Sequence, residues 1–596
     1  MRTGSTAVVT FVMVCGLAVL PGGCGADFLP GSDWPDGQDQ ADESSATTPA
    51  EPRVLGGSMW TAARTSGVAP LAVFFDTVDP GSGVFQPTDG DYASLGYEWD
   101  FGDADSGTWS TNGNSRNTAM GYVAAHVYEQ PGTYMATLSV TDTQGETHAY
   151  HQQITVAAFG GTTYYVSSSS GSDGNSGLSP TAPLASFGAA MSKVGTNRRI
   201  LFKRGDTWTT WGGEPIGWEG PGIIGAYYRS DGSDDRSRPK PHIVITGDGS
   251  GLGCNGPWAS DWRIMDLHFS AADWTIGWGL DLGWAGAVRW LLLRVEIDGF
   301  DVGIGCTDSG TSFIENMIAE CNVHDIMGIG AYLAGSRLAV LGTRITDMVE
   351  SHSLRVWHAE KAVFSENMCH YPGPTRQALK LHGYDLGQGP ATEYVVVSNN
   401  SFRGSTYTVA IAPENAQSDE PIRHVVVERN VITPDDQMVV GVYVSADDVT
   451  IRNNIFDGTG GPGWLTAVYL SDGVGSALHD IKICNNTAYQ GGWASEFRLC
   501  SIDSSAQDTV VRNNLASAPQ TSDRWLIVGA GAGLVADHNL LTSAPGFADA
   551  SSGDFRLESS SPAVDAGTDV AGVFVDYDCL PRPVGSGVDV GACERQ

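Results

Sequence analysis

Basic residues are scarce in this 596-residue chain. Lysine and arginine total 33 against 68 aspartates and glutamates, so the formal net charge is −35 at pH 7. Proteins that bind nucleic acid neutralise its phosphates with a basic surface, so this composition excludes that class of function. Glycine is frequent instead, at 76 residues, and 41% of the chain is hydrophobic. These values indicate a folded, acidic protein with many turns rather than a disordered one.

No hydrophobic run is long enough to cross a bilayer comfortably. The run of about 14 mostly apolar residues from Ala7 to Leu20 has the length of a signal-peptide core. Small residues separate it from Cys24, so residues 1–24 resemble a bacterial lipoprotein signal in which Cys24 becomes lipidated. The resemblance implies a lipid-anchored protein at the bacterial outer membrane or cell surface. Cleavage without lipidation, followed by secretion, is the alternative.

Zinc-type cysteine spacing is also missing. None of the eight cysteines beyond the signal segment forms a C-x-x-C pair. In the oxidising environment that an exported protein meets, we expect a local disulfide between Cys579 and Cys593. Buried thiols are the alternative for the other cysteines.

Two segments follow the signal. Residues 25–54 are acidic and rich in Gly, Ser and Pro, so we expect a flexible linker there. From residue 55 to 158, short runs of alternating hydrophobicity are separated by Gly, Pro and Asp turns, which is typical of a small β-sandwich. Several strings in this segment occur in a characteristic order: WDFGD at 99–103, HVYEQPGTY at 126–134 and LSVTD at 138–142.

These strings resemble the PKD (polycystic-kidney-disease) domain. On exported proteins, such domains usually serve as spacers or as modules that contact carbohydrate. The exposed aromatic rings of such a domain offer sugar-binding surface, but we expect Trp99 and Tyr134 to pack in the core of the sandwich.

Beyond residue 160 the sequence repeats itself. Short β-rich pieces close on an asparagine followed by an apolar residue, at intervals of mostly 24 to 33 residues: Asn322, Asn367, Asn400, Asn430, Asn454, Asn486, Asn514 and Asn539. The first interval is about twice as long, and Arg344 occupies the missing place. This period indicates a solenoid whose repeats bury their apolar faces against one another. We expect a right-handed parallel β-helix in which the asparagines stack and satisfy the turn amides.

The two ends of the repeat region carry a family resemblance. The opening, YYVSSSSGSDGNSG to ILFKRGDTW, and the close, GDFRLESSSPAVDAG to DVGACE, resemble exported β-helix proteins of the pectate-lyase-like superfamily. The resemblance implies a β-helix over residues 160–545 and a C-terminal capping segment over 546–596. It specifies the fold rather than the activity, because activity depends on the site.

Aligning the coils on their asparagines predicts one outward column of side chains. The strings GAYLA, SLRVW and ALKLH stack on one another, and strand alternation directs Arg355, Trp357, Lys380 and His382 outward. We therefore expect Arg355 beside Lys380, and Trp357 over His382. Further members extend the column in both directions: Tyr332, Tyr443, Tyr469 and Arg498.

This column predicts β-elimination of an acidic polysaccharide. Aromatic rings offer flat apolar area to sugars, and cations hold uronate carboxylates. One group must neutralise the carboxylate, a base must remove the adjacent proton, and an acid must assist the departing glycosidic oxygen. We assign the first role to Arg355 and the second to Lys380, whose proton affinity the neighbouring cation lowers. His382 is either the acid or a hydrogen-bond donor to the substrate. The remaining members of the column are assigned to substrate binding.

Similar β-helix polysaccharide lyases use Lys and Arg from neighbouring coils, sometimes with a calcium ion that bridges the carboxylate. The resemblance therefore implies calcium as a candidate cofactor. The sequence shows no compact carboxylate cluster for it, and Asp298, Asp301 and Asp385 are the nearest oxygen ligands.

Two other functions stay open. An inverting glycosidase needs two carboxylates about 6.5–9.5 Å apart, and we do not expect Glu350, Glu360 and Glu366 to converge. A non-catalytic adhesin or surface scaffold would use the β-helix as a rigid glycan-binding arm. The net charge of −35 favours the scaffold, because an acidic chain repels a polyanion at long range.

Overall fold

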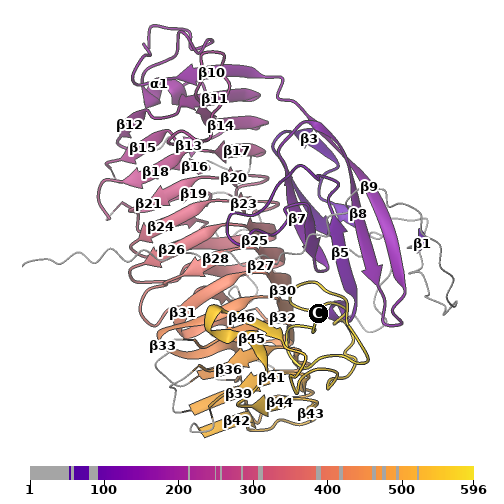
Figure 1. Ribbon diagram of the computed structural model, residues 1–596. Coiled ribbons are helices and arrows are strands. Elements are labelled where there is room, and N and C mark those ends of the chain that lie inside the picture. The colour runs from indigo at the N-terminus through magenta and orange to yellow at the C-terminus, as the bar shows by residue number, and fades with distance from the viewer. Residues whose placement is uncertain are drawn as a thin grey trace, which may run out of the picture.

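The computed structural model shows an all-β protein in which a β-sandwich lies along a β-helix (Figure 1). The structure describes residues 53–54, 60–78, 91–212, 215–247, 250–254, 258–274, 276–283, 286–306, 313–383, 391–414, 420–459, 465–472, 478–491, 496–519 and 523–596. The expected signal segment with Cys24 and almost all of the expected linker lie outside these residues. Within them, no helix is long and apolar enough to span a membrane.

The sandwich consists of two sheets. One sheet has the order β1-β9-β8-β5-β6, with β3 also paired to β9, and the other has the order β2-β4-β7. The strands are β1 (Arg53–Val54), β2 (Thr61–Ala62), β3 (Ser66–Val68), β4 (Leu71–Asp76), β5 (Gly96–Asp100), β6 (Thr118–Met120), β7 (Val123–Tyr128), β8 (Gly132–Thr141) and β9 (Thr147–Ala157), and the 3-10 helix η2 (Tyr92–Ser94) precedes β5. Trp99 is 2% exposed and lies against Phe75 and Trp60. Its predicted core position is confirmed.

The predicted parallel β-helix is also confirmed. Strands β10 to β44 pair in parallel with the equivalent strand of the next coil, and each coil contributes to three faces. A short helix, α1 (Phe187–Met191), covers the N-terminal end, where the Ser186 hydroxyl accepts the Ala189 amide.

The first face contains β10 (Thr162–Val166), β11 (Arg198–Lys203), β14 (Gly222–Tyr227), β17 (Trp262–Met265), β20 (Leu291–Leu293), β23 (Met317–Ala319), the ends of β25 (Ile329–Leu341) and β27 (Leu354–Ser365), β30 (Thr392–Ser398), β32 (Ile422–Glu428), β34 (Asp447–Arg452), β37 (Lys482–Cys484), β40 (Val510–Arg512) and β43 (Val535–Asp537).

The second face contains β12 (Thr207–Thr210), β15 (His242–Ile245), β18 (His268–Ala271), β21 (Glu296–Asp298), β24 (Asn322–Ile326), β26 (Arg344–Met348), β28 (Met368–His370), the starts of β31 (Ser401–Ile411) and β33 (Val431–Val444), β35 (Ile455–Asp457), β38 (Thr487–Tyr489), β41 (Leu515–Ser517) and β44 (Leu540–Thr542).

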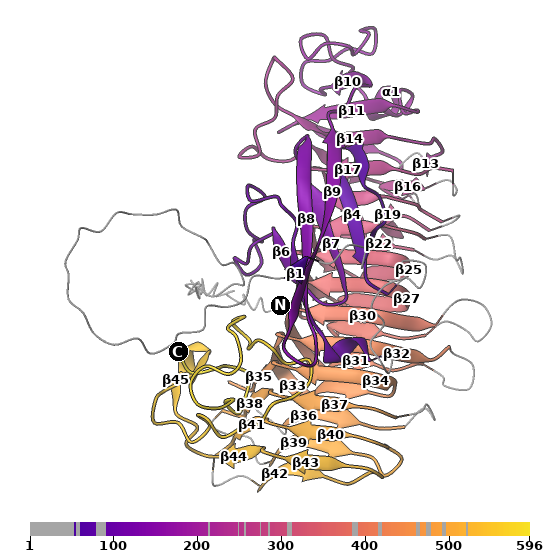
Figure 2. The same cartoon turned by 90° about the vertical axis from the view of Figure 1, so that its right-hand side faces the viewer.

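The third face contains β13 (Pro215–Ile216), β16 (Leu252–Cys254), β19 (Trp278–Asp281), β22 (Val302–Gly305), the starts of β25 and β27, β29 (Leu379–Leu381), the ends of β31 and β33, β36 (Leu465–Leu470), β39 (Glu496–Ile502) and β42 (Asp523–Val528). Its N-terminal strands lie at the right in Figure 2.

The asparagine stack lies at the turn between the first and second faces. The side-chain amide of Asn367 donates to Oδ1 of Asn400 at 3.0 Å, and that of Asn400 donates to Oδ1 of Asn430 at 2.9 Å. The same bond recurs in the following coils through Asn454, Asn486, Asn514 and Asn539. Each Oδ1 also accepts a backbone N–H of the preceding coil, so the ladder satisfies amides that no strand pairs.

The start of the predicted ladder was wrong by one residue. Asn322 pairs with Arg344 inside the second face, in strands β24 and β26. The ladder positions above Asn367 are Thr343, whose amide donates to Asn367, and Cys321, whose amide donates to the Thr343 hydroxyl. In these coils a hydroxyl or a backbone group replaces the amide side chain.

The sandwich packs against the first face rather than acting as a spacer. Outward side chains of this face, among them Leu291, Leu341, Val363, Val396 and Val426, belong to the same buried cluster as Trp99 and Phe75. The inward neighbours Leu292, Phe364 and Val397 belong to the core of the solenoid. The first-face strands are therefore apolar on both sides, which explains runs such as LLL and VVV.

Polar contacts fix the sandwich in place. Nζ of Lys361 lies 2.8 Å from Oδ2 of Asp76, and both groups are buried. The Tyr122 hydroxyl donates to the carbonyl of His424, and Glu129 forms an ion pair with Arg294.

The C-terminal segment folds back along the last coils (Figure 1). It contains β45 (Phe547–Asp549), the 3-10 helix η3 (Ala550–Ser552) and β46 (Asp554–Leu557), and it covers Ile455 and Leu515 of the second face. The expected Cys579–Cys593 disulfide was wrong, because Cys593 is a free, buried thiol. Burial in the apolar cluster with Phe555 raises the pKa of this thiol well above its usual value.

Candidate functional site

The predicted outward column exists on the third face. Tyr332 pairs with Arg355, and Arg355 pairs with Lys380, so the two cations are register neighbours on adjacent coils. Leu354 and Val356, on either side of Arg355, are buried in the core. Side-chain alternation thus places the pair on the outer surface, as the sequence predicted.

Arg355 makes contacts in three directions. Its Nε donates to Nε2 of His382 at 3.2 Å, and its Nη2 lies 2.6 Å from Oε1 of Glu414 in an ion pair. Its guanidinium also lies 5.1 Å from the centre of the Tyr332 ring, in a cation–π contact. The sequence did not predict Glu414, because this residue lies in a loop after its strand, 59 positions from Arg355.

His382 is held in its neutral form. The residue is 3% exposed, and burial together with the charges of Arg355 and Lys380 lowers its pKa to about 2. Since Nε2 accepts from Arg355, this imidazole is not a proton donor to substrate through that nitrogen. The assignment of His382 as the catalytic acid stays a prediction, and its contact through Nε2 makes it a positioning residue for Arg355.

A second buried histidine, His352, is affected by the same cations. His352 is 5% exposed, and its pKa is lowered to about 3 by burial and by the charges of Arg355, Lys380 and Arg376. Three cations thus act on one small region of a chain whose net charge is −35. Such a region favours an anionic ligand.

Trp357 bulges out of its strand. The pairing of β25 with β27 shifts by one residue at this point, because Leu333 pairs with Val356 while Ala334 pairs with His358. The extra residue is Trp357, whose ring centre lies 5.5 Å from that of Tyr332. Bulges re-aim side chains next to functional sites, and here the bulge brings two aromatic rings together.

The column continues through a small residue. Lys380 pairs with Ala410, Ala410 with Tyr443, and Tyr443 with Tyr469. Ala410 is 2% exposed, so its neighbours cover this position of the column, and Lys380 and Tyr443 lie two coil spacings apart, about 9.6 Å. Ring contacts with Tyr407 and Tyr469 hold Tyr443, and its burial raises its pKa.

Arg498 does not belong to this column. Tyr469 pairs with Ser501, and Arg498 pairs with Thr466 and Trp525. Its guanidinium lies 5.5 Å from the Trp525 ring and 3.4 Å from Glu496. The prediction placed it three residues out of register, because no asparagine or turn marks the strand start in this coil.

The acidic residues considered for calcium are not gathered at Arg355. Asp298 contacts His268 at 3.0 Å on the second face, and burial and the charge of Glu350 raise the pKa of Asp301. Asp385 lies outside the described residues. Glu360 accepts a hydrogen bond from Ser336, and Glu366 lies at the sandwich, so these glutamates do not converge, as expected.

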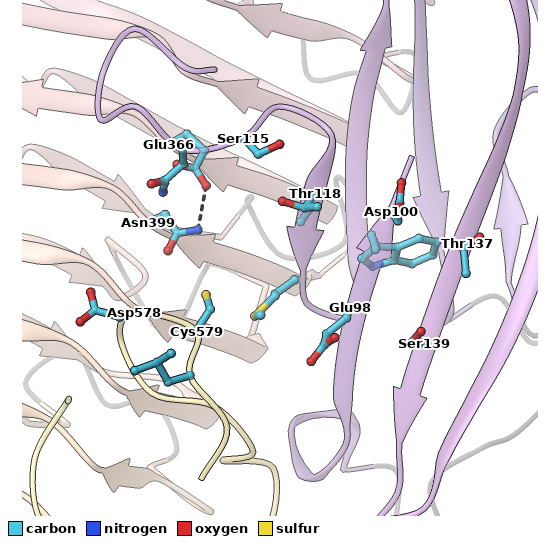
Figure 3. Close-up of a pocket in the computed structure, with 15 residues that line it drawn as sticks. Glu98, Asp100, Ser115, Thr118, Thr137, Ser139, Glu366, Asn399, Asp578 and Cys579 are labelled. Atoms are coloured by element: carbon cyan, nitrogen blue, oxygen red, sulfur yellow. Dashed lines mark hydrogen bonds between the residues drawn. The ribbon is translucent and has the colours of Figure 1, made fainter. Parts of the chain in front are cut away.

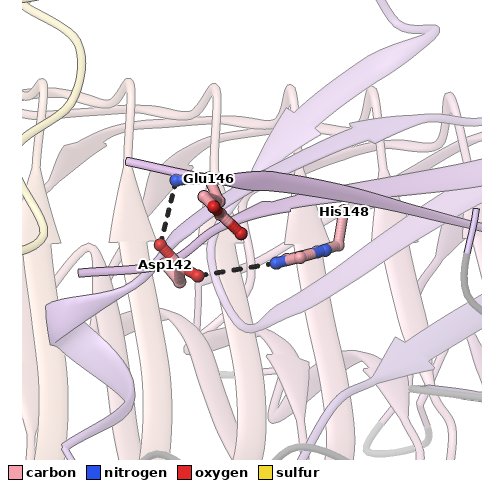
Figure 4. A group of neighbouring side chains, drawn as sticks. All are labelled: Asp142, Glu146 and His148. Atoms are coloured by element: carbon pink, nitrogen blue, oxygen red, sulfur yellow. Dashed lines mark hydrogen bonds and ion pairs between the residues drawn. The ribbon is translucent and has the colours of Figure 1, made fainter. Parts of the chain in front are cut away.

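Among the described residues, one group has three possible metal ligands close together: Asp142, Glu146 and His148, in the β8–β9 hairpin (Figure 4). Oδ1 of Asp142 accepts the amides of Gln144 and Glu146, and Oδ2 lies 3.5 Å from His148. Turn geometry and this ion pair account for the group.

A cavity of about 440 Å³ lies where the sandwich, the first face and the C-terminal segment meet (Figure 3). Its lining includes the carboxyl groups of Glu98, Glu366 and Asp578, whose pKa values are all raised by burial. Asn112, Asn114 and Asn399 donate to the Glu366 carboxyl. No sequence pattern predicts this cavity, because residues from three separate segments form it.

Comparisons with known proteins support the division of the chain. The PKD domain model matches residues 68–158, which confirms the expected domain. No curated protein sequence matches the chain. Solved structures that match include pectate lyase Pel9A, with 16% identity over 74% of this chain and 98% of that one, at a TM-score of 0.37.

Two further matches are the PL6 alginate lyase AlyGC and an epimerase module. AlyGC shows 15% identity, a TM-score of 0.38, and coverage of 60% of this chain and 50% of that one. The Azotobacter vinelandii mannuronan C-5 epimerase AlgE4 A-module shows 13% identity, a TM-score of 0.34, and coverage of 63% and 97%. These scores are below 0.5, so the fold assignment rests on the strand pairing itself.

Proposed function

We propose that the third face binds an acidic polysaccharide across Arg355 and Lys380 and cleaves it by β-elimination. The observation that carries this proposal is the pairing of Arg355 with Lys380 on adjacent coils, beside the ring of Tyr332. On so acidic a chain, a cationic centre flanked by aromatic rings fits a ligand that has both carboxylates and apolar sugar faces.

Binding exchanges one carboxylate for another. Glu414 is half exposed and pairs with Arg355. A uronate carboxylate takes its place on the guanidinium, which accepts carboxylates in a two-pronged geometry. The sugar ring then lies over the outer face of the column, with Lys380 and Tyr443 on either side of the buried Ala410.

In the reaction, Lys380 acts as its neutral amine and removes the proton on the carbon next to the carboxylate. The electron pair of that C–H bond forms a carbon–carbon double bond as the glycosidic C–O bond breaks. The departing oxygen takes a proton from the phenol of Tyr443, whose raised pKa keeps that proton in place before the reaction. Arg355 stabilises the charge that develops on the carboxylate.

The test is to incubate the full chain with alginate, polygalacturonate and glycosaminoglycans and to follow the absorbance of unsaturated uronate products. The expected result is product formation with at least one of these, lost in Lys380→Met. Arg423→Met, which removes an exposed cation on the first face, serves as the control. Binding without any product would contradict the elimination and leave the scaffold function.

We also infer export with a lipid on Cys24. Support comes from the sequence of residues 1–24 alone. Metabolic labelling with a palmitate analogue is expected to label the chain, and Cys24→Ser is expected to abolish the label. A labelled Cys24→Ser variant would contradict lipidation at this residue.

A further inference from the structure

Tryptophans are exposed around the N-terminal part of the third face. Trp211 is 72% exposed, Trp258 60%, Trp218 55% and Trp274 41%. A soluble surface seldom leaves so many large rings in water, because each offers 150–250 Å² for burial in a contact.

These four tryptophans lie just before or just after the short strands β13, β16 and β19 of the third face. Trp211 and Trp274 precede β13 and β19, at the corner between the second and third faces. Trp218 and Trp258 follow β13 and β16, at the corner between the third and first faces. Hydrogen bonds and packing fix the backbone at these corners. Nε1 of Trp262 donates to the carbonyl of Trp218 at 2.6 Å. The Trp211 ring lies where a side chain on Gly247 of the next coil would stand.

Strand register between the two corners places Pro215, Gly253, Asp281 and Gly305 in one column, which forms the floor, and Gly305 pairs with Tyr332, which begins the candidate site. The Trp278 ring lies over Gly305, where a side chain on that residue would stand. An aromatic surface therefore leads along the third face from the tryptophans to Tyr332.

The charge of this part of the third face differs from that of the candidate site. Strands β13, β16, β19 and β22 contain no lysine or arginine, and neither do residues 209–223, 246–262 and 272–288, which include the corners. The floor carries one carboxyl group, Asp281, whose pKa is raised by burial. Carboxyl groups accept hydrogen bonds from sugar hydroxyls but repel uronates.

We propose that residues Trp211, Trp218, Trp258 and Trp274 form a subsite for neutral sugar units, so that the ligand is a mixed polysaccharide. Its neutral units stack on the tryptophans, and an acidic unit lies at Arg355 and Lys380. This inference rests on the proposed function for the acidic unit only, because the tryptophan subsite binds neutral sugars on its own.

The experiment measures retention of the full chain in gels that contain neutral galactomannan, neutral β-glucan, polygalacturonate, or xanthan, which carries both neutral and acidic units. Xanthan and at least one neutral polymer are expected to retain the chain. Trp211→Ala combined with Trp258→Ala is expected to weaken neutral retention about tenfold, because two ring faces lose their contact. Met135→Ala, at an exposed apolar residue of the sandwich, is the matched control.

The two proposals fail separately. If both proposals are right, the tryptophan variant binds polygalacturonate as the natural chain does. The variant Lys380→Met is then retained by the neutral polymers as the natural chain is. Neutral polymers that are not retained, or that are retained equally by the tryptophan variant, overturn the neutral subsite whatever happens at Lys380. Added salt should weaken only the acidic contact, because ions screen charge and not stacking.

Discussion

Asp76 in the sandwich and Lys361 in the β-helix form a buried ion pair, with 2.8 Å between Oδ2 and Nζ and side-chain exposures of 1% and 11%. These residues are 285 positions apart, and the pair lies beside the apolar contact of β7 with β27. The sandwich is therefore part of the same folded unit as the solenoid, and it covers a face that would otherwise expose a stripe of aliphatic side chains.

Removing one partner should destabilise the whole chain. Lys361→Met removes the nearer cation from the buried Asp76 carboxylate and leaves Arg337, whose Nη2 lies 3.9 Å from Oδ2, so we expect a cost of about 3 kcal/mol in the free energy of unfolding. The free energy of unfolding of each variant is measured by urea denaturation. Asp76→Leu together with Lys361→Met should recover most of it, whereas Arg423→Met at an exposed pair should cost less than about 1 kcal/mol. Equal losses in the buried and exposed variants would contradict a shared core.

The asparagine ladder predicts a position-specific loss. Asn454→Ala removes a side chain that is fully buried, donates to Asn486 and accepts from Asn430. Because the partners lose hydrogen bonds and stay buried, the free energy of unfolding should fall by about 1–3 kcal/mol. Asn322→Ala, outside the ladder, is the control and should cost less than half as much. The losses of stability in the two variants are compared by thermal unfolding.

Acid should weaken the protein through His352 and His382, two of its buried histidines. The pKa values of His352 and His382 are lowered to about 3 and about 2, so the unfolded chain binds protons below pH 6.5 while the folded chain does not. Their contribution is complete above pH 6.5 and is lost as the pH falls, at about 1.4 kcal/mol per pH unit for each group.

The measurement is urea unfolding between pH 6.5 and 5 of the natural chain and of the variant His352→Gln with His382→Gln. Carboxyl groups with a raised pKa, such as Asp576 at about 6, titrate in both proteins, so the comparison isolates the two imidazoles, and the variant should show the flatter dependence. An unchanged slope would mean that the imidazoles are not held neutral.

The small size of Ala410 should set the position of Lys380 and Tyr443. Ala410 is 2% exposed, so Ala410→Leu forces a branched side chain into a filled position and displaces both neighbours, and binding of polygalacturonate or alginate should weaken at least about tenfold. Ala410→Ser changes the volume little and is the control. Melting temperatures should show that both variants remain folded. Undiminished binding by Ala410→Leu would place the sugar elsewhere.

Periodicity predicted the solenoid well, because it is a local property. Each coil must turn at the same place and bury the same alternating side chains, so Asn430 and Asn454 mark equivalent turns without reference to any distant residue. The pairing of Arg355 with Lys380 followed from the same periodicity. Arg498 was misplaced and Asn322 was counted in the ladder because strand starts without a distinct marker leave the register open.

The contacts of the sandwich could not be predicted in this way. From the sequence alone, Val363, Val396 and Val426 are ordinary strand residues. In the structure their side chains point outward and are buried against the sandwich. The runs of three apolar residues in these coils carried that signal, because a solvated face would have alternated. The contact of Glu414 with Arg355 depends on a loop, and the neutral state of His382 depends on burial. Neither follows a periodic pattern in the sequence.

By itself, the sequence determined the architecture: a PKD-type sandwich, a parallel β-helix with an asparagine ladder, and two cations side by side on one outer face. Tertiary structure alone decided which face the sandwich covers, which carboxylate holds Arg355, and that His382 is too buried and too close to cations to carry a proton. The reason is physical: repeated short-range hydrogen bonds set the coils, whereas burial and charge at the site come from segments far apart in the chain.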